Sequence, residues 1–144
     1  MNLVRGPARR PEWAQMIRLG GDRVAVLFNE LRKSVGKIDG IIERLHYSAE
    51  EDRWVVKYSI DGLELFTARI FPGSLEAEMA LSASEAKALL RSETLSRTLR
   101  NTVNSRLQER QAGLINFPLT NRRAARSFAS LVRAKSRLGH GNQL

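Results

Sequence analysis

Hydrophobic residues near the start of the chain recur at helical spacing in two groups. The first group lies between Pro11 and the Gly20-Gly21 pair, which would break a helix. The second group follows the i, i+3, i+4 spacing of a helix face that packs on a core, with Asp22 as the expected N-cap and Gly36 as the stop. Its members are Val24, Leu27, Phe28, Leu31 and Val35. The pattern therefore predicts a short helix followed by a longer one.

Between residues 40 and 81 the hydrophobic spacing changes to alternation, which is typical of strands buried on one face. The clearest case is Trp54, Val56, Tyr58 and Ile60, which alternate with Arg53, Val55, Lys57 and Ser59. The Asp61-Gly62 pair is a two-residue hairpin signal. The pattern predicts a meander of four strands over residues 40–47, 53–60, 63–71 and 75–81.

Helical spacing returns at Ser82, which with Glu85 forms a capping-box pattern. A longer helix follows, with an apolar residue every four positions, and it should fray near Gly113. Its apolar residues are Leu95, Leu99, Val103 and Leu107. A short strand over 114–119 contains Pro118 and is therefore expected at a sheet edge. A last helix should start at Thr120 or Asn121 and end near Leu138. Lys135 lies on its apolar side and is expected to extend past the end of the core.

These elements predict an α+β fold with a small antiparallel sheet, formed by the four-strand meander and one short later strand, packed by helices. The chain has 144 residues, enough for one domain with an unaided core. We expect this single domain at 12–138, a basic flexible arm at 1–11 and a disordered tail at 139–144.

The net charge of +9 is concentrated in the last third of the chain. Residues 1–90 hold 13 Lys and Arg against 13 Asp and Glu, whereas residues 91–144 hold 11 against two, Glu93 and Glu109. A basic segment beside a neutral body indicates an acidic partner that contacts one end of the molecule.

The last predicted helix carries a stripe of arginines. At about 100° per residue, four arginines fall within about 60° of one another, and Arg123 flanks them. The four are Arg122, Arg126, Arg133 and Arg137. Such a stripe fits a phosphate backbone, because guanidinium groups match phosphate oxygens and counterion release drives association. The alternative interpretation is a solvated outer face that favours solubility.

The polar side of the predicted sheet offers a second candidate site. Arg44, His46, Lys57 and Arg69 are expected on the face opposite the core, with Glu76 and Glu78 nearby. Several cations on one surface could bind a small anionic ligand. The alternative is a set of cross-strand charge pairs on a solvated sheet face.

Motifs of catalysis and metal binding are absent from the sequence. There is no cysteine, and the two histidines, His46 and His140, have no partners at metal-ligand spacing. No P-loop, dinucleotide fingerprint or G-x-S-x-G elbow occurs. We therefore predict no catalytic residue, metal site or cofactor. With no apolar run long enough for a membrane span, we predict a cytoplasmic protein with no membrane partner.

The order of elements resembles a bacterial group of uncharacterised proteins similar to the YdhG-like and MmcQ/YjbR-like α+β proteins. The resemblance covers roughly residues 24–138. It is carried by the strand from Trp54 to Tyr58, by the segment 114–119, and by Phe128, Leu131, Val132 and Lys135. It implies a small antiparallel sheet backed by helices, and for some relatives a DNA-binding role is proposed by analogy.

We expect a non-catalytic binding module whose basic C-terminal third contacts nucleic acid or an acidic protein surface. One alternative is a protein-interaction subunit with an apolar patch around Trp13 and Met16. Another is a small-ligand binder or an unrecognised enzyme with a pocket on the sheet, where Lys57, Arg69 and His46 converge. The oligomeric state stays open.

Overall fold

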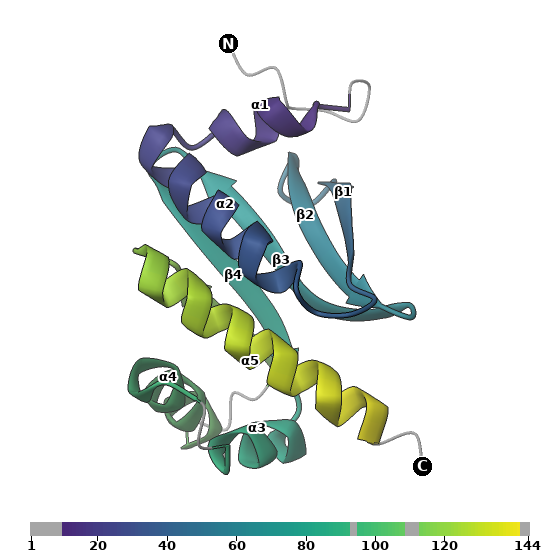
Figure 1. The fold of residues 1–144 in the computed structure, drawn as a ribbon, viewed down its shortest axis with the longest axis vertical. Helices are drawn as coiled ribbons and strands as arrows, with labels where there is room; N and C mark the ends of the chain where they lie inside the picture. Colours follow the sequence, from purple (N-terminus) through teal and green to yellow (C-terminus); the bar gives the residue numbers. More distant parts are fainter. Residues whose placement is uncertain (1–9, 93–94, 109–112, 142–144) are drawn as a thin grey trace.

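A computed structural model describes residues 10–92, 95–108 and 113–141 of the chain. Two helices come first, then four strands, two helices, a fifth strand and a last helix (Figure 1). The helices are α1 (Trp13–Arg18), α2 (Asp22–Val35), α3 (Ala83–Leu90), α4 (Arg97–Gln108) and α5 (Arg122–Gly141). The strands are β1 (Ile42–Ser48), β2 (Arg53–Ile60), β3 (Leu63–Phe71), β4 (Ser74–Leu81) and β5 (Gly113–Pro118). The predicted α+β class is confirmed.

The five strands form one antiparallel sheet in the order β1-β2-β3-β4-β5. The first four strands are the predicted meander, and β5 joins the outer side of β4 after the chain has passed through α3 and α4. Asp61 and Gly62 both have positive φ, +50° and +81°, as a type I′ hairpin turn requires. Pro118 lies in the edge strand β5, where its missing N–H costs no ladder bond, so that prediction is confirmed.

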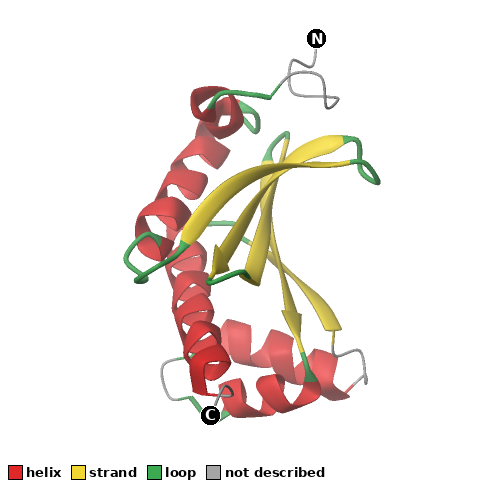
Figure 2. Cartoon of the chain, turned by 90° about the vertical axis from the view of Figure 1, so that its right-hand side faces the viewer, coloured by secondary structure: helices red, strands yellow, loops and turns green. Residues whose placement is uncertain are grey.

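Helices α2 and α5 lie side by side across one face of the sheet, and the strands curve away from them (Figures 1 and 2). The core lies between these layers. Phe128 of α5 packs edge-on against Phe66 of β3, with 5.0 Å between the ring centroids. Phe117 of β5 packs on the same Phe128 ring at a centroid distance of 5.3 Å. The face of the sheet away from α2 and α5 is called the open face below.

Two helix boundaries differ from the predicted ones. Gly21, rather than Asp22, is the N-cap of α2, and its φ of +98° favours glycine. Asp22 stands in the first turn, where its charge suits the helix dipole. Helix α5 extends to Gly141, past the predicted end near Leu138, because one glycine costs a helix only about 1 kcal/mol. Residues 1–9 of the predicted arm, 109–112 before Gly113 and 142–144 of the predicted tail lie outside the described residues, whereas 139–141 belong to α5 and are not the disordered tail expected there.

The ladder between β3 and β4 ends early, which the sequence did not predict. Its last pair is Thr67 with Glu78, although β4 continues to Leu81 beside β5. Leu65 is an extra residue in β3 opposite β2, a β-bulge that lies just beyond this last pair. Bulges bend a strand and increase its twist, so β3 turns away from β4 at this point.

Candidate functional site

The exposed side of α5 is almost entirely arginine. Between residues 122 and 137, every exposed position is an arginine except Ser130. The buried side consists mainly of small and apolar residues such as Phe128, Leu131 and Val132, all fully buried, but it also includes Lys135. The arginines are Arg122, Arg123, Arg126, Arg133 and Arg137, called the basic α5 face below. The structure therefore gathers the five candidate residues of the last helix on one surface.

Carboxylates are scarce beside the basic α5 face. Arg126 Nη1 lies 3.7 Å from Glu30 Oε1 of α2. Within the described ranges, the other four arginines have no carboxylate oxygen within 4.0 Å. Within the described ranges, most of the positive charge of this face is therefore not neutralised by carboxylates of the protein.

The neighbouring helix α2 carries two exposed cations, Arg23 and Lys33, beside one exposed acid, Asp22. Lys33 is exposed on its outer side, and Arg23 Nη2 donates a hydrogen bond of 2.9 Å to the carbonyl of Thr120, just before α5 begins. The net charge of residues 1–90 does not reveal these cations, because the acids of the same segment cancel them. In space many of those acids lie on the sheet rather than on α2.

Both ends of the basic α5 face lead into hollows. At the start of α5, a cavity of about 560 Å³ is lined by Arg97 and Arg123 together with several hydroxyl groups. Helices α4 and α5 both begin there, so their N-terminal partial positive charges add to those of the arginines. Toward the other end, Arg133 and Arg137 line a cavity of about 420 Å³ with Ser130. An anionic polymer on this surface would meet paired arginines at each end.

The second candidate set lies on the open face, as strand alternation predicted, but its main cations are paired. Lys57 Nζ lies 2.8 Å from Glu64, and this hydrogen bond lowers the pKa of the Glu64 carboxyl. Arg69 contacts Glu51 at 2.9 Å and Glu78 at 3.2 Å.

His46, Lys57 and Arg69 line a cavity of about 380 Å³, whereas Arg44 is not among its lining residues. The carboxylates nearby compensate the charge of Lys57 and Arg69. Lys57–Glu64 and Arg69–Glu78 are cross-strand charge pairs, whereas Glu51 belongs to the turn between β1 and β2.

The proposed apolar patch at the first helix is not free. Met16 is fully buried, because α1 packs on α2. Trp13 is half-buried, with the guanidinium of Arg32 4.7 Å above its ring. The expectation of an exposed patch at these two residues is therefore wrong.

Lys135 does not extend past the core as expected. It is only 8% exposed, donates a hydrogen bond to the carbonyl of Ala80, and has its Nζ 3.7 Å from Glu85 Oε2. Burial lowers the pKa of the Lys135 amine, and Glu85 offsets part of this effect. The sequence does place Lys135 on the core side of a helix, which hints at a buried amine. It does not indicate the carboxylate partner, because Glu85 is far away in sequence.

Comparisons with known protein families, curated proteins and solved structures found no match to this chain. The resemblance to the YdhG-like and MmcQ/YjbR-like proteins therefore stays a prediction. Within the described part of the chain, no three His, Asp or Glu side chains are grouped to hold a metal ion. None of the described helices is both long enough and apolar enough to cross a membrane.

Proposed function

We propose that the protein is a non-catalytic nucleic-acid-binding module and that the basic α5 face contacts the phosphate backbone of a duplex. One observation carries this proposal: the exposed side of α5 presents five arginines, four of them without a carboxylate within 4.0 Å among the described residues. Unpaired guanidinium groups can bind phosphate oxygens in a bidentate manner without first breaking an ion pair.

The length of the basic α5 face suits a polymer rather than a single small anion. At about 1.5 Å of rise per residue, Arg122 and Arg137 lie about 22 Å apart along the helix axis. Duplex DNA carries a negative charge about every 1.7 Å of its axis, so a surface of this length can meet several phosphates at once. The exposed cations of α2 would add contacts beside it.

The aromatic residues favour a duplex over a single strand. Proteins that bind single strands usually stack bases on exposed aromatic side chains. Here every aromatic residue is buried or half-buried, and Phe128, the aromatic residue of α5, points into the core. Contacts to the phosphates alone carry no sequence information, so we expect binding with little sequence preference.

The test is fluorescence anisotropy with labelled duplex DNA, single-stranded DNA and polyglutamate at physiological salt. Arg122, Arg126, Arg133 and Arg137 are changed together to Gln, which keeps a high helix propensity. A matched control replaces four exposed cations elsewhere, Arg10, Arg18, Arg44 and Lys87, so that the net charge falls equally.

We expect the wild type to bind the duplex more tightly than the other two ligands. The affinity of the α5 variant for the duplex should fall about tenfold or more, and that of the control should fall clearly less. Equal losses of duplex affinity in the two variants would show that only the net charge matters, and this would contradict the proposal. Tighter binding of polyglutamate than of duplex would also contradict it and point to an acidic protein instead.

A further inference from the structure

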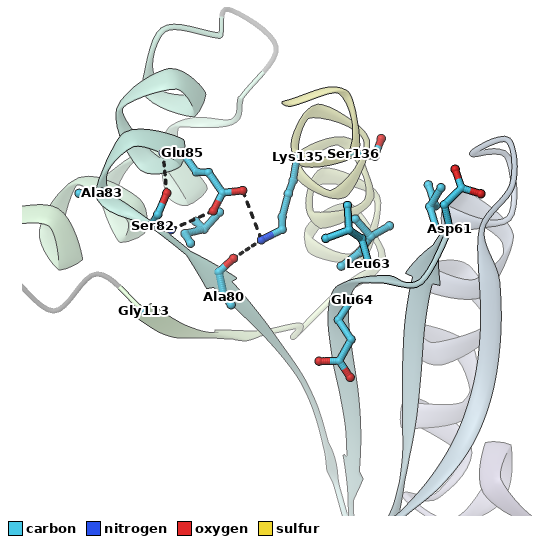
Figure 3. Close-up of a pocket in the computed structure, with 13 residues that line it drawn as sticks. Asp61, Leu63, Glu64, Ala80, Ser82, Ala83, Glu85, Gly113, Lys135 and Ser136 are labelled. Carbon is cyan, nitrogen blue, oxygen red and sulfur yellow. Dashed lines mark hydrogen bonds and ion pairs between the residues drawn. The ribbon is translucent and has the colours of Figure 1, made fainter. Parts of the chain in front are cut away.

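The divergence of β3 from β4 opens a pocket that is separate from the basic α5 face (Figure 3). Past the Thr67–Glu78 pair, β3 stays with β2 and β4 stays with β5. The space between them has a volume of about 440 Å³, within the usual range of small-molecule sites. Much of its wall is apolar, with Ile60, Leu65 and Leu81 among the lining residues. We call it the splayed-strand pocket.

Because the ladder between β3 and β4 has ended here, one backbone carbonyl at the wall of this pocket has no hydrogen-bond partner in β3. The Leu75 carbonyl accepts a 2.9 Å hydrogen bond from the N–H of Leu119, so it points away from β3. Carbonyls alternate in direction along a strand, and Ala80 lies an odd number of residues further on. The Ala80 carbonyl therefore points toward β3, where the ladder has ended, and Lys135 of α5 donates to it instead.

Lys135 has N–H donors left over, because among the described residues only the Ala80 carbonyl accepts a hydrogen bond from it, and Glu85 Oε2 at 3.7 Å is an ion-pair partner. An ammonium group carries three N–H donors. In the described part of the chain, its two oxygen partners are the Ala80 carbonyl and Glu85. Glu85 is itself held in place, because its Oε1 accepts a 2.9 Å hydrogen bond from the N–H of Ser82. Figure 3 shows Lys135 reaching from α5 toward Ala80 and Glu85 beside the pocket.

The charges around the pocket disfavour an anion. Glu85 compensates Lys135, and Lys57 compensates Glu64 at 2.8 Å. Asp61 at the rim has no such ion-pair partner in the described ranges, so the charged lining residues together with Lys57 leave one negative charge in excess. A carboxylate ligand would meet this excess, whereas a neutral acceptor would not.

We propose that the splayed-strand pocket binds a neutral small molecule that has an apolar body and a carbonyl oxygen, which accepts a hydrogen bond from Lys135 Nζ. The apolar body fills the space between β3 and β4, where its burial drives binding. The carbonyl fixes its orientation. This site does not depend on the nucleic-acid-binding function proposed above.

The first test compares 2-octanone with octanoate, which share an apolar chain but differ in charge. Each is titrated into the full-length ¹⁵N-labelled protein while amide chemical shifts are followed. We expect 2-octanone to shift the amides of Leu63, Leu81 and Ala83 saturably, and octanoate to bind about tenfold more weakly. Equal or tighter binding of octanoate, or shifts confined to other regions, would overturn the proposal.

The second test changes the donor. Lys135→Met keeps an apolar stem and removes the ammonium group, while Lys87→Met makes the same change at an exposed position of α3. We expect Lys135→Met to weaken 2-octanone binding about tenfold and Lys87→Met to leave it unchanged. Equal affinity in all three proteins would show that Lys135 is not the donor.

A third measurement needs no variant, in case Lys135→Met fails to fold. Octanal is added with sodium cyanoborohydride: the amine nitrogen attacks the aldehyde carbon, water leaves as an imine forms, and hydride reduces the imine to a secondary amine. Peptide mass mapping should find Lys135 alkylated faster than Lys87, with protection by excess 2-octanone. Alkylation of Lys135 no faster than of Lys87, or unaffected by 2-octanone, would contradict the proposal.

Discussion

Arg32 of α2 and Glu43 of β1 form a bidentate pair, with Nε and Nη2 donating to the two carboxylate oxygens at 2.9 and 2.8 Å. Tyr58 of β2 donates to the same carboxylate at 2.7 Å, and the Arg32 guanidinium lies over the ring of Trp13 in α1. Glu43 thereby links α2 to β1 and β2, and Arg32 adds a contact to α1.

Changing Glu43 to Gln should destabilise the protein by about 1–3 kcal/mol, because Arg32 and Tyr58 would lose a charged acceptor in a partly buried site. Urea denaturation at pH 7 measures the free energy of unfolding. Glu50→Gln removes the same charge at an exposed position and should change this free energy by less than about 0.5 kcal/mol. Equal effects of the two substitutions would show that the Glu43 pairing is energetically unimportant.

Stability should fall steeply in alkali because of Tyr58. Burial, and then the charge of Glu43, raise the pKa of its hydroxyl well above the ordinary value. Above about pH 10 the unfolded chain releases this proton while the folded protein retains it, so unfolding becomes more favourable by up to about 1.4 kcal/mol per pH unit.

Tyr58→Phe removes this group, so its free energy of unfolding should depend less on pH above 10 than that of the wild type. Chemical denaturation at several alkaline pH values tests this. Tyr47→Phe, at a partly exposed tyrosine, should keep most of the wild-type slope. Parallel pH profiles for wild type and Tyr58→Phe would contradict the prediction.

Arg69 should hold the turn between β1 and β2 against the open face, since its guanidinium contacts Glu51 of that turn and Glu78 of β4. In Arg69→Met, amide hydrogen exchange in residues 49–52 should speed up about tenfold, equivalent to about 1.4 kcal/mol of lost protection. Arg44→Met removes an exposed cation from the same face and should leave exchange in the turn unchanged. Unchanged exchange in Arg69→Met would mean that the turn is held by its backbone alone.

The capping box at the start of α3 is also testable. Ser82 Oγ accepts a 3.1 Å hydrogen bond from the N–H of Glu85, whose side chain accepts one from the Ser82 N–H. Ser82→Ala should cost about 1 kcal/mol, whereas Ser82→Asp should retain most of the stability because aspartate also caps well. Thermal unfolding of both variants would show whether the cap contributes as expected; equal midpoints would contradict it.

Local patterns in the sequence were enough to predict most elements. Alternation around Trp54 and Tyr58 and the turn residues Asp61-Gly62 are short-range signals, and the structure has the strands and hairpin that they indicate. Helical periodicity likewise predicts which side of α5 is exposed, because the arginines and the core residues of that helix occupy opposite sectors.

Contacts between distant segments were not predictable in the same way. Nothing near Lys135 in the sequence indicates that Glu85 and the Ala80 carbonyl would receive its amine. The bulge does leave a signal in the sequence, because the apolar alternation shifts by one position between Leu65 and Phe66. The loss of the β3–β4 ladder beyond this point depends on how two strands curve, which no single-strand pattern records.

The most direct test of the nucleic-acid interface is the salt dependence of duplex binding for the wild type and the variant with Arg122, Arg126, Arg133 and Arg137 changed to Gln. Each phosphate contact contributes about −0.9 to the slope of log K against log salt concentration. If the four arginines bind phosphates, the slope of the variant should be shallower by about 3 to 4. Equal slopes in the two proteins would contradict the account, because they would show that the basic α5 face makes no phosphate contacts.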